Sequence, residues 1–407
     1  MVSRWRWIGR LAVLGLGLGA ASVGLAGCGT SLVRNPVADP VAAASATIPG
    51  LAAARFWGDE VPKDLAAEFR RRLPNLNRLA QSGTTTDGRP IVNILALSGG
   101  GSDGAFGAGL LAGWTARGNR PQFELVTGIS AGAIIAPFAF LGSKYDSQLR
   151  EIWTEYETSE LVIAQILPGL LGGPSLASTA PLEALIAKYV DKKFLRAIAA
   201  EYRQGRVLLI GTTNLDAQRP VVWNMGEIAA SGHSDALDLF RKVIMASAAL
   251  PGLFPPVTIP VDAGGTKAEE LHVDGGVTRE VFVAPIPVGL KALDPFYPAP
   301  PRRTIYIIKN GKITPEFEAV KPTAVSIALR SIWTLTKSQN ENDIYRIWRM
   351  ARDADAGFNL AAVPAKFAEK PKQAFDPVYQ MKLFDEGFKF GRSGAAWLNS
   401  PPVKRAR

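Results

Sequence analysis

The sequence contains very little cysteine or histidine. Cys28 is the only cysteine among 407 residues, and the only histidines are His233 and His272. A single cysteine excludes an internal disulfide and a site built from several thiolates. No zinc-ligand spacing is present either. We therefore expect no metal and no cofactor, and any histidine-dependent chemistry must use one of these two residues.

The sequence also lacks a concentrated basic tract. The formal net charge is +10, yet no dense basic and aromatic segment of the kind found in nucleic-acid-binding proteins occurs. We expect no nucleic-acid partner. The positive balance suits anionic lipid headgroups, and diffuse solvating charge explains it equally well. Hydrophobic residues make up 47% of the chain and charged residues 20%, which predicts a folded domain with a sizeable core.

No apolar run reaches the roughly 20 residues of a membrane-spanning helix. The N-terminus instead reads MVSRWRWIGR, then LAVLGLGLGAASVG, then LAGC. A basic region, a short apolar stretch and small residues are typical of a secretory signal. A plain membrane anchor is the alternative. LAGC resembles the lipobox of bacterial lipoproteins, which implies cleavage before Cys28 and lipid attachment to it. Gly29 then favours the outer membrane, facing the periplasm.

This pattern predicts three regions. Residues 1–27 are a signal peptide, residues 28–60 are the lipidated cysteine with an Ala/Pro-rich tether, and residues 61–400 are one domain. Within the domain, strand-like and helix-like segments alternate, which predicts an α/β/α layered fold with a mainly parallel sheet. We expect strands over 91–98, 123–128, 206–215, 271–276 and 303–312, a further strand at RPVVWNM, a helix over 62–76 broken by Pro74, and helices after Gly104 and Ser130 and over 235–250 and 324–352.

The first expected strand runs into GGGSDG, which matches G-x-G-x-x-G at Gly99, Gly101 and Gly104. A dinucleotide fingerprint has this form, but it also needs an acidic residue at the end of the second strand. TGIS stands there instead, which argues against a dinucleotide. An alternative is an oxyanion hole, in which backbone N–H groups stabilise a developing negative charge. A tight turn without chemistry is the third possibility.

The second expected strand ends in TGISAGA, where Ser130 occupies a G-x-S-x-G pattern. Flanking glycines permit the sharp strand-to-helix turn that presents a nucleophilic serine. Such a serine needs a base. His272 is one candidate, His233 a less suitable one, and Asp274 in HVDGG is another, because burial can raise the pKa of a carboxyl group. Asp274 is also readily explained as a turn residue.

Taken in order, GGGSDG, GISAG and DGG resemble the patatin-like phospholipases over residues 91–290. The resemblance implies a patatin-like fold, a Ser130 nucleophile, an Asp274 base without histidine, and an oxyanion loop formed by Gly99, Gly100 and Gly101. One position departs from the family pattern, because Asp103 stands where Arg or Lys is usual. We expect the Asp103 side chain to cap the helix that begins at Gly104.

The sequence therefore predicts a membrane-anchored serine lipid acyl hydrolase of the phospholipase A or esterase type, acting on lipid esters. The alternative from another class is a non-catalytic envelope lipoprotein that keeps the fold and binds lipid or a protein, for which Asp103 is the main support. Dinucleotide binding is a further alternative.

Overall fold

A computed structural model describes residues 34–62, 66–67, 75, 84–161, 163–164, 175, 177–284, 289–395 and 397–402. The expected signal peptide and Cys28 lie outside these residues, as does most of the helix expected over 62–76. Across the described ranges, none of the helices combines the length and hydropathy that crossing a bilayer requires.

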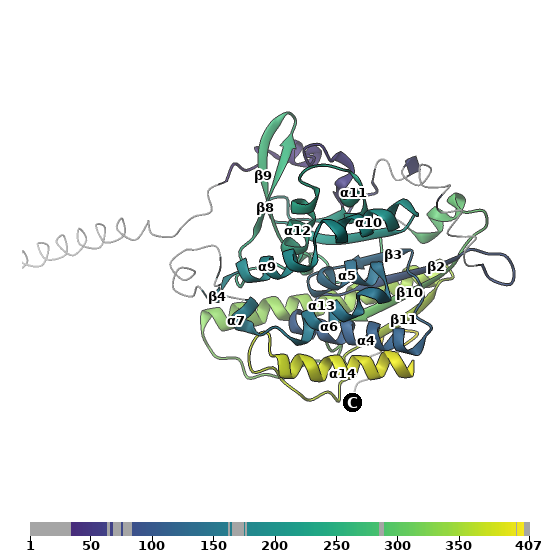
Figure 1. The fold of residues 1–407 in the computed structure, drawn as a ribbon. Helices are drawn as coiled ribbons and strands as arrows, with labels where there is room; N and C mark the ends of the chain where they lie inside the picture. Colours follow the sequence, from purple (N-terminus) through teal and green to yellow (C-terminus); the bar gives the residue numbers. More distant parts are fainter. Residues whose placement is uncertain are drawn as a thin grey trace, which may run out of the picture.

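The described residues form a mixed sheet with strand order β1-β7-β6-β3-β2-β10-β11 (Figure 1). The neighbours β6, β3, β2, β10 and β11 run parallel, while β7 and β1 continue the sheet antiparallel. This confirms the predicted α/β fold with a mainly parallel central sheet. The hairpin β8–β9 pairs with the end of β6. The strands are β1 Arg55–Trp57, β2 Ile91–Leu97, β3 Leu125–Gly128, β6 Val207–Asn214, β7 Arg219–Asn224, β8 Val257–Ala263, β9 Thr266–Asp274, β10 Arg302–Lys309 and β11 Gly357–Ala362, with a small separate pair β4 Ile163–Ala164 and β5 Ala177–Ser178.

Helices cover both faces of this sheet. Side chains of β2 alternate between two cores: Leu95 and Leu97 pack in the larger one with α4, α5 and α12, and Ile94 and Ala96 pack in the smaller one with α13. The expected helix over 324–352 is thus a single helix, α13. The helices are α2 Pro40–Ser45, α4 Gly104–Arg117, α5 Ala131–Leu141, α6 Asp146–Thr154, α7 Thr158–Leu161, α9 Ala180–Tyr189, α10 Lys192–Arg203, α11 Met225–Ala230, α12 Ala236–Ser247, α13 Ala324–Asp353 and α14 Pro377–Ser393.

Two helices far apart in sequence, α4 and α14, lie with their backbones in direct contact (Figure 1). A Cβ atom on Gly109 or Gly113 of α4 would overlap a backbone carbonyl of α14, and one on Gly387 or Gly391 would overlap a carbonyl of α4. Glycine is therefore required on both sides of this contact. The C-terminal helix thereby becomes part of the layer that holds the glycine loop preceding α4.

The N-terminal segment differs from the expectation of a tether over residues 28–60. From Arg34 onward the described chain packs against the domain: Arg34 forms an ion pair with Asp216, and β1 pairs with β7. Ile48 and Leu51 are buried in the larger core. The Ala- and Pro-rich composition conceals these few apolar anchors, so residues 34–60 belong to the folded unit.

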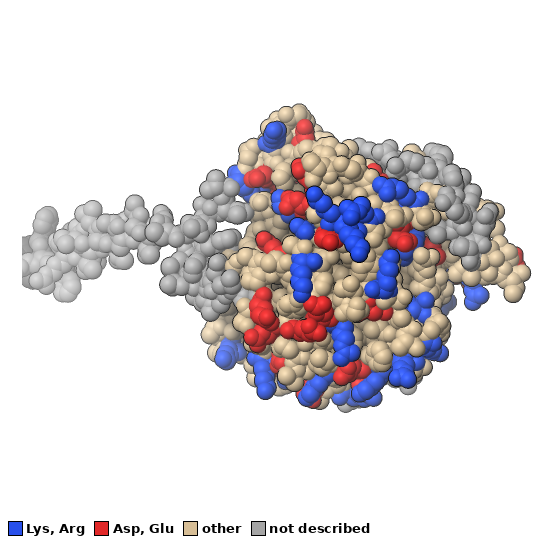
Figure 2. All heavy atoms as spheres, viewed as in Figure 1, with Lys and Arg blue, Asp and Glu red and all other residues tan. Residues whose placement is uncertain are grey.

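Charge on the surface is mixed. On the face shown in Figure 2, Lys and Arg side chains are interspersed with Asp and Glu and with uncharged surface. This distribution agrees with a general solvating role for the charged side chains on that face.

Candidate active site

Ser130 lies at the turn between β3 and α5 with φ 52° and ψ −120°. Residues other than glycine rarely adopt a positive φ, so this backbone is strained, as at many functional sites. The neighbouring glycines are needed for close packing: a Cβ on Gly128 would overlap the carbonyl of Gly132, and one on Gly132 would overlap the carbonyl of Leu97. The geometry is that of a sharp strand-to-helix elbow carrying a half-buried serine.

A buried serine that the sequence analysis did not single out holds this elbow in place. The Ser130 N–H donates to Ser247 Oγ at 3.0 Å, and the Ser247 hydroxyl donates to the Gly211 carbonyl at 2.7 Å. Ser247 ends α12 and Gly211 is in β6. One hydroxyl group therefore links the elbow to a helix and a strand, and a lone serine in a helix gives no sequence signal for such a role.

Asp274 is brought to Ser130 by the antiparallel pairing of β9 with β6, in which it lies opposite Thr212. Its Oδ1 accepts a hydrogen bond from the Gly276 N–H at 2.8 Å. Burial, reinforced by the nearby Glu280 carboxylate, raises the pKa of Asp274 to about 7, although hydrogen bonds from Gly276 and from the Ser130 hydroxyl act in the opposite direction. A buried carboxylate with a pKa near neutrality, close enough to a serine hydroxyl to be affected by it, has the properties of a general base.

The three glycines that precede α4 differ in their backbone hydrogen bonds. The Gly99 N–H donates to the Glu280 carbonyl at 3.3 Å, whereas the N–H groups of Gly100 and Gly101 have no acceptor among the described residues. Gly100 has φ 156° and Gly101 has φ 56°, and a Cβ on Gly100 would overlap the Asn310 carbonyl. The donors left free for an oxyanion are therefore those of Gly100 and Gly101, while Gly99 fixes the loop to the chain that follows Asp274.

Asp103 does not cap α4, contrary to the sequence-based expectation. It occupies the N-cap position, but its side chain makes no capping hydrogen bond. Instead Asp103 Oδ1 accepts from the Tyr379 hydroxyl of α14 at 2.6 Å. Burial raises the pKa of Asp103 to about 6, partly offset by the Tyr379 hydrogen bond. The close α4–α14 contact supplies a long-range partner that outcompetes the local cap.

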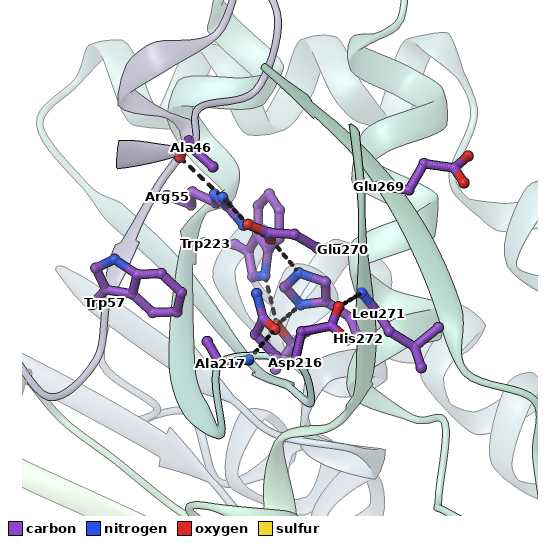
Figure 3. Close-up of polar contacts among 12 residues, drawn as sticks. Ala46, Arg55, Trp57, Asp216, Ala217, Trp223, Glu269, Glu270, Leu271 and His272 are labelled. Atoms are coloured by element: carbon purple, nitrogen blue, oxygen red, sulfur yellow. Dashed lines mark hydrogen bonds and ion pairs between the residues drawn. The ribbon is translucent and has the colours of Figure 1, made fainter. Parts of the chain in front are cut away.

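His272 lies in a separate buried network, shown in Figure 3. Its Nδ1 lies 2.9 Å from Thr212 Oγ1 and its Nε2 lies 3.0 Å from Glu270 Oε2. The Trp223 indole N–H donates to the same Thr212 oxygen at 2.8 Å. Burial lowers the pKa of His272, so the ring is neutral. The Thr212 hydroxyl then donates to Nδ1, and the Nε2–H donates to Glu270.

Arg55 completes this network and connects it to the N-terminal segment. Its guanidinium pairs with both oxygens of Glu270 and donates to the Ala46 carbonyl at 3.0 Å. This ion pair holds the pKa of Glu270 down at about 2 despite burial. Arg55 thus joins residues 46–55 to Glu270 of β9, and both ring nitrogens of His272 are engaged, by Thr212 and by Glu270.

A second buried carboxylate, Glu280, lies beside the candidate dyad. A Cβ on Gly99 would lie 2.8 Å from its Oε1, and one on Gly276 would lie 2.5 Å from its Oε2, so the carboxylate lies between the glycine loop and the Asp274 turn. Lys309 Nζ is 3.6 Å away, and the Glu280 backbone N–H donates to Asp343 at 2.8 Å. Burial raises the pKa of Glu280. The residue follows DGG by four positions, and no local motif marks it.

A cavity of about 530 Å³ opens beside the glycine loop. Its lining includes Gly100, Glu280 and Lys309 on the inner side and Arg330 and Trp333 of α13 on the outer side. Within the part of the chain that the structure describes, no group of three or more His, Cys, Asp or Glu side chains is arranged to hold a metal ion. The groups described at this site are a serine, carboxylates and backbone N–H groups.

Part of the chain matches a known protein family. Residues 95–287 match the model of the patatin-like phospholipase family. Among similar solved structures is VipD from Legionella pneumophila, with 12% identity and a TM-score of 0.33 over 75% of this chain and 70% of VipD. Another is human GIVD cytosolic phospholipase A2, with 10% identity and a TM-score of 0.35 over 77% of this chain and 55% of the phospholipase. No curated protein sequence matches the chain.

The matched range contains the Gly99–Gly101 loop, the Ser130 elbow and Asp274. Residues 95–287 are therefore similar to the patatin-like phospholipases, a family of carboxylic ester hydrolases.

Proposed function

We propose that the protein is a membrane-anchored serine acyl hydrolase that releases fatty acid from lipid esters through a Ser130–Asp274 dyad. The observation that carries this proposal is the strained elbow of Ser130 together with the buried Asp274, whose pKa of about 7 is influenced by the Ser130 hydroxyl. The N–H groups of Gly100 and Gly101 support the same chemistry, because they have no acceptor among the described residues and are available to an oxyanion. They lie in the turn that precedes α4.

The reaction has two halves. Ionised Asp274 accepts the proton of Ser130 as its Oγ attacks the ester carbonyl carbon, and the Gly100 and Gly101 N–H groups stabilise the resulting oxyanion. The C–O bond to the alcohol then breaks, the alcohol takes the proton from Asp274, and an acyl-serine remains. Water attacks this ester while Asp274 accepts its proton, and fatty acid leaves as the proton returns to Ser130.

The direct test is fatty-acid release from mixed phospholipid vesicles and from a short-chain soluble ester. We expect Ser130→Ala and Asp274→Asn to reduce both rates by several orders of magnitude, whereas Ser143→Ala, at an exposed serine after α5, should leave them unchanged. Circular dichroism establishes that each variant is folded. Full activity in a folded Asp274→Asn protein would eliminate the dyad, and no release by the wild type on any ester would favour a binding role.

The membrane attachment belongs to the same proposal and has its own test. The motif LAGC supports removal of residues 1–27 and acylation of Cys28, with the protein held at the outer membrane and facing the periplasm. Mass spectrometry of the protein extracted from membranes should find a chain that begins at Cys28 and carries lipid. Cys28→Ala should retain the unprocessed mass, and an unmodified wild-type cysteine would contradict the proposal.

The non-catalytic alternative depended on Asp103. The Tyr379 hydrogen bond gives that carboxylate a structural partner, which explains Asp103 without a purely binding role.

A further inference from the structure

The Gly99–Gly101 loop follows β2 and lies against the chain that follows β10. These two strands are parallel neighbours in the sheet (Figure 1), so Ser98 and Asn310, which follow their carboxyl ends, lie side by side. Both residues are fully buried. Gly100 approaches the same segment so closely that a Cβ atom on it would lie 1.8 Å from the Asn310 carbonyl oxygen. The loop is therefore supported from behind by the end of the neighbouring strand.

The carbonyl groups of this loop are occupied, in contrast to the N–H groups of Gly100 and Gly101. The Asn310 side-chain amide donates to the Ser98 carbonyl at 2.7 Å. The Ser98 hydroxyl donates to the Gly99 carbonyl at 2.7 Å. The Gly100 carbonyl accepts from a backbone N–H of the following turn at 3.1 Å. Of these three bonds, the one from the Ser98 hydroxyl acts on the peptide unit between Gly99 and Gly100.

That peptide unit supplies one of the two donors available to an oxyanion. The Gly99 carbonyl and the Gly100 N–H belong to the same planar group, and in a trans peptide the C=O and N–H bonds point in opposite directions. A hydrogen bond that holds the carbonyl on one side of the loop therefore directs the N–H to the other side. The Ser98 hydroxyl thus fixes the direction of the Gly100 donor.

A peptide unit between two glycines needs such a restraint. Rotating it changes ψ of Gly99 and φ of Gly100, and neither residue has the Cβ atom that limits these angles elsewhere. A rotated peptide would present the Gly99 carbonyl oxygen where the donor should be, and two oxygens repel. The restraint is itself oriented, because Ser98 Oγ accepts from the Asn310 N–H at 3.0 Å, which leaves its own proton for the Gly99 carbonyl.

We propose that Ser98 is a positioning residue for ester hydrolysis, whose hydroxyl holds the Gly99–Gly100 peptide so that the Gly100 N–H faces the oxyanion. Ser98 acts through this peptide and takes no part in the bond changes at Ser130. The inference rests on the proposed serine hydrolysis for its purpose, but the orientation of the peptide is measured independently of catalysis. A buried hydroxyl that only stabilises the turn is the competing explanation.

The kinetic test compares Ser98→Ala with wild type on a soluble short-chain ester. We expect kcat to fall about 10–100-fold, because the Gly100 donor is misdirected in most molecules, while KM changes less than about threefold. The inhibition constant of an alkyl trifluoromethyl ketone, which Ser130 converts to a hemiketal oxyanion, should rise at least tenfold. Thr154→Val is the matched control: it removes a buried hydroxyl that donates to the Arg150 carbonyl at 2.8 Å, and it should change both constants less than twofold.

Two results would overturn the proposal in solution: an unchanged kcat in folded Ser98→Ala, or a lower kcat with an unchanged inhibition constant, which would mean that Ser98 only stabilises the turn. Ser98→Cys has a similar shape but a weak donor, so it should show the same changes and serves as the second variant if alanine prevents folding.

A crystal structure of either Ser98 variant tests the peptide without relying on activity. The Gly99 carbonyl should be rotated in some or all molecules, and a single peptide orientation identical to that of wild type would overturn the proposal. If Ser130→Ala shows that no serine-dependent hydrolysis exists, the proposed function fails, and the crystal structure still decides whether Ser98 holds the peptide.

Discussion

Replacing Asp274 with Asn is expected to give a protein that is inactive and yet more stable than wild type at alkaline pH. The side chain keeps an oxygen that accepts the Gly276 N–H, so the turn is retained. What the variant loses is a carboxylate that must ionise inside the protein to act as a base. Catalysis and folding therefore place opposite demands on this one group.

The magnitude follows from the pKa of Asp274. Its ordinary value is 3.8, and burial beside Glu280 raises it to about 7. A difference of about 3 in pKa corresponds to roughly 4 kcal/mol between the two protonation states. The direction of the pH dependence follows from the raised pKa. The unfolded chain releases this proton above pH 3.8, whereas the folded protein retains it up to about pH 7. The free energy of unfolding of the wild type therefore falls as pH rises through this window. Above pH 7 the full cost of about 4 kcal/mol is present.

The assay is urea unfolding of wild type and Asp274→Asn at pH 5 and pH 8. The stability advantage of the variant should be greater at pH 8 by about 2–3 kcal/mol, because only part of the cost is present at pH 5. Asp353→Asn is the control, since that carboxylate is 70% exposed. Its effect on the free energy of unfolding should differ little between the two pH values.

The reasoning is refuted if the advantage of Asp274→Asn is the same at both pH values. That result would mean that the carboxyl group titrates at its ordinary pKa, and that it is not desolvated as the structure indicates. A variant that gains the expected stability but keeps its hydrolase rate would leave the burial argument intact and remove Asp274 from the chemistry.

Three further predictions concern the groups around the dyad. Glu280→Gln removes a charge that raises the pKa of Asp274, so the acidic limb of the kcat/KM profile on a soluble ester should move to lower pH; a limb that stays in place would contradict this. Tyr379→Phe removes the hydrogen bond to Asp103, whose pKa is about 6. In urea unfolding, the free energy of unfolding should fall by about 1.5–3 kcal/mol at pH 8, where Asp103 is charged, and by less at pH 5. An equal loss at both pH values would show that Asp103 does not ionise in this range. His272→Phe removes one hydrogen-bond partner from Thr212, which keeps Trp223, and one from Glu270, which keeps Arg55. The variant should lose about 1–3 kcal/mol of stability in thermal unfolding, while the folded fraction retains serine-dependent turnover; a stable but inactive variant would restore histidine as the base.

Local rules predicted the parts of the site in which neighbours in sequence are neighbours in space. The glycines around Ser130, the strand before the elbow and the helix after it could be inferred because the turn itself needs them. The partner of Asp103 could not, since Tyr379 lies 276 residues away and meets it only through the α4–α14 contact. A side chain at an N-cap position has a default local role, and here tertiary packing replaced it.

The same limit applies to Glu280 and to the segment before β1. Glu280 becomes notable only when the Gly99 loop and the Gly276 turn fold onto it from two directions. Residues 34–60 contain few apolar anchors among many alanines and prolines, so composition averaged over the segment hides the contacts that fix it. Sparse long-range contacts leave no periodic pattern in a sequence.

The glycine contact between α4 and α14 couples the position of α14 to that of the Gly99–Gly101 loop. At the four contact glycines no side chain separates the two backbones, so a shift of α14 there is transmitted to α4 and to the Gly100 and Gly101 donors that precede it. The outer side of α14 is exposed at many positions. A ligand, antibody fragment or crosslink that displaces α14 would therefore inhibit hydrolysis from a site distant from the substrate.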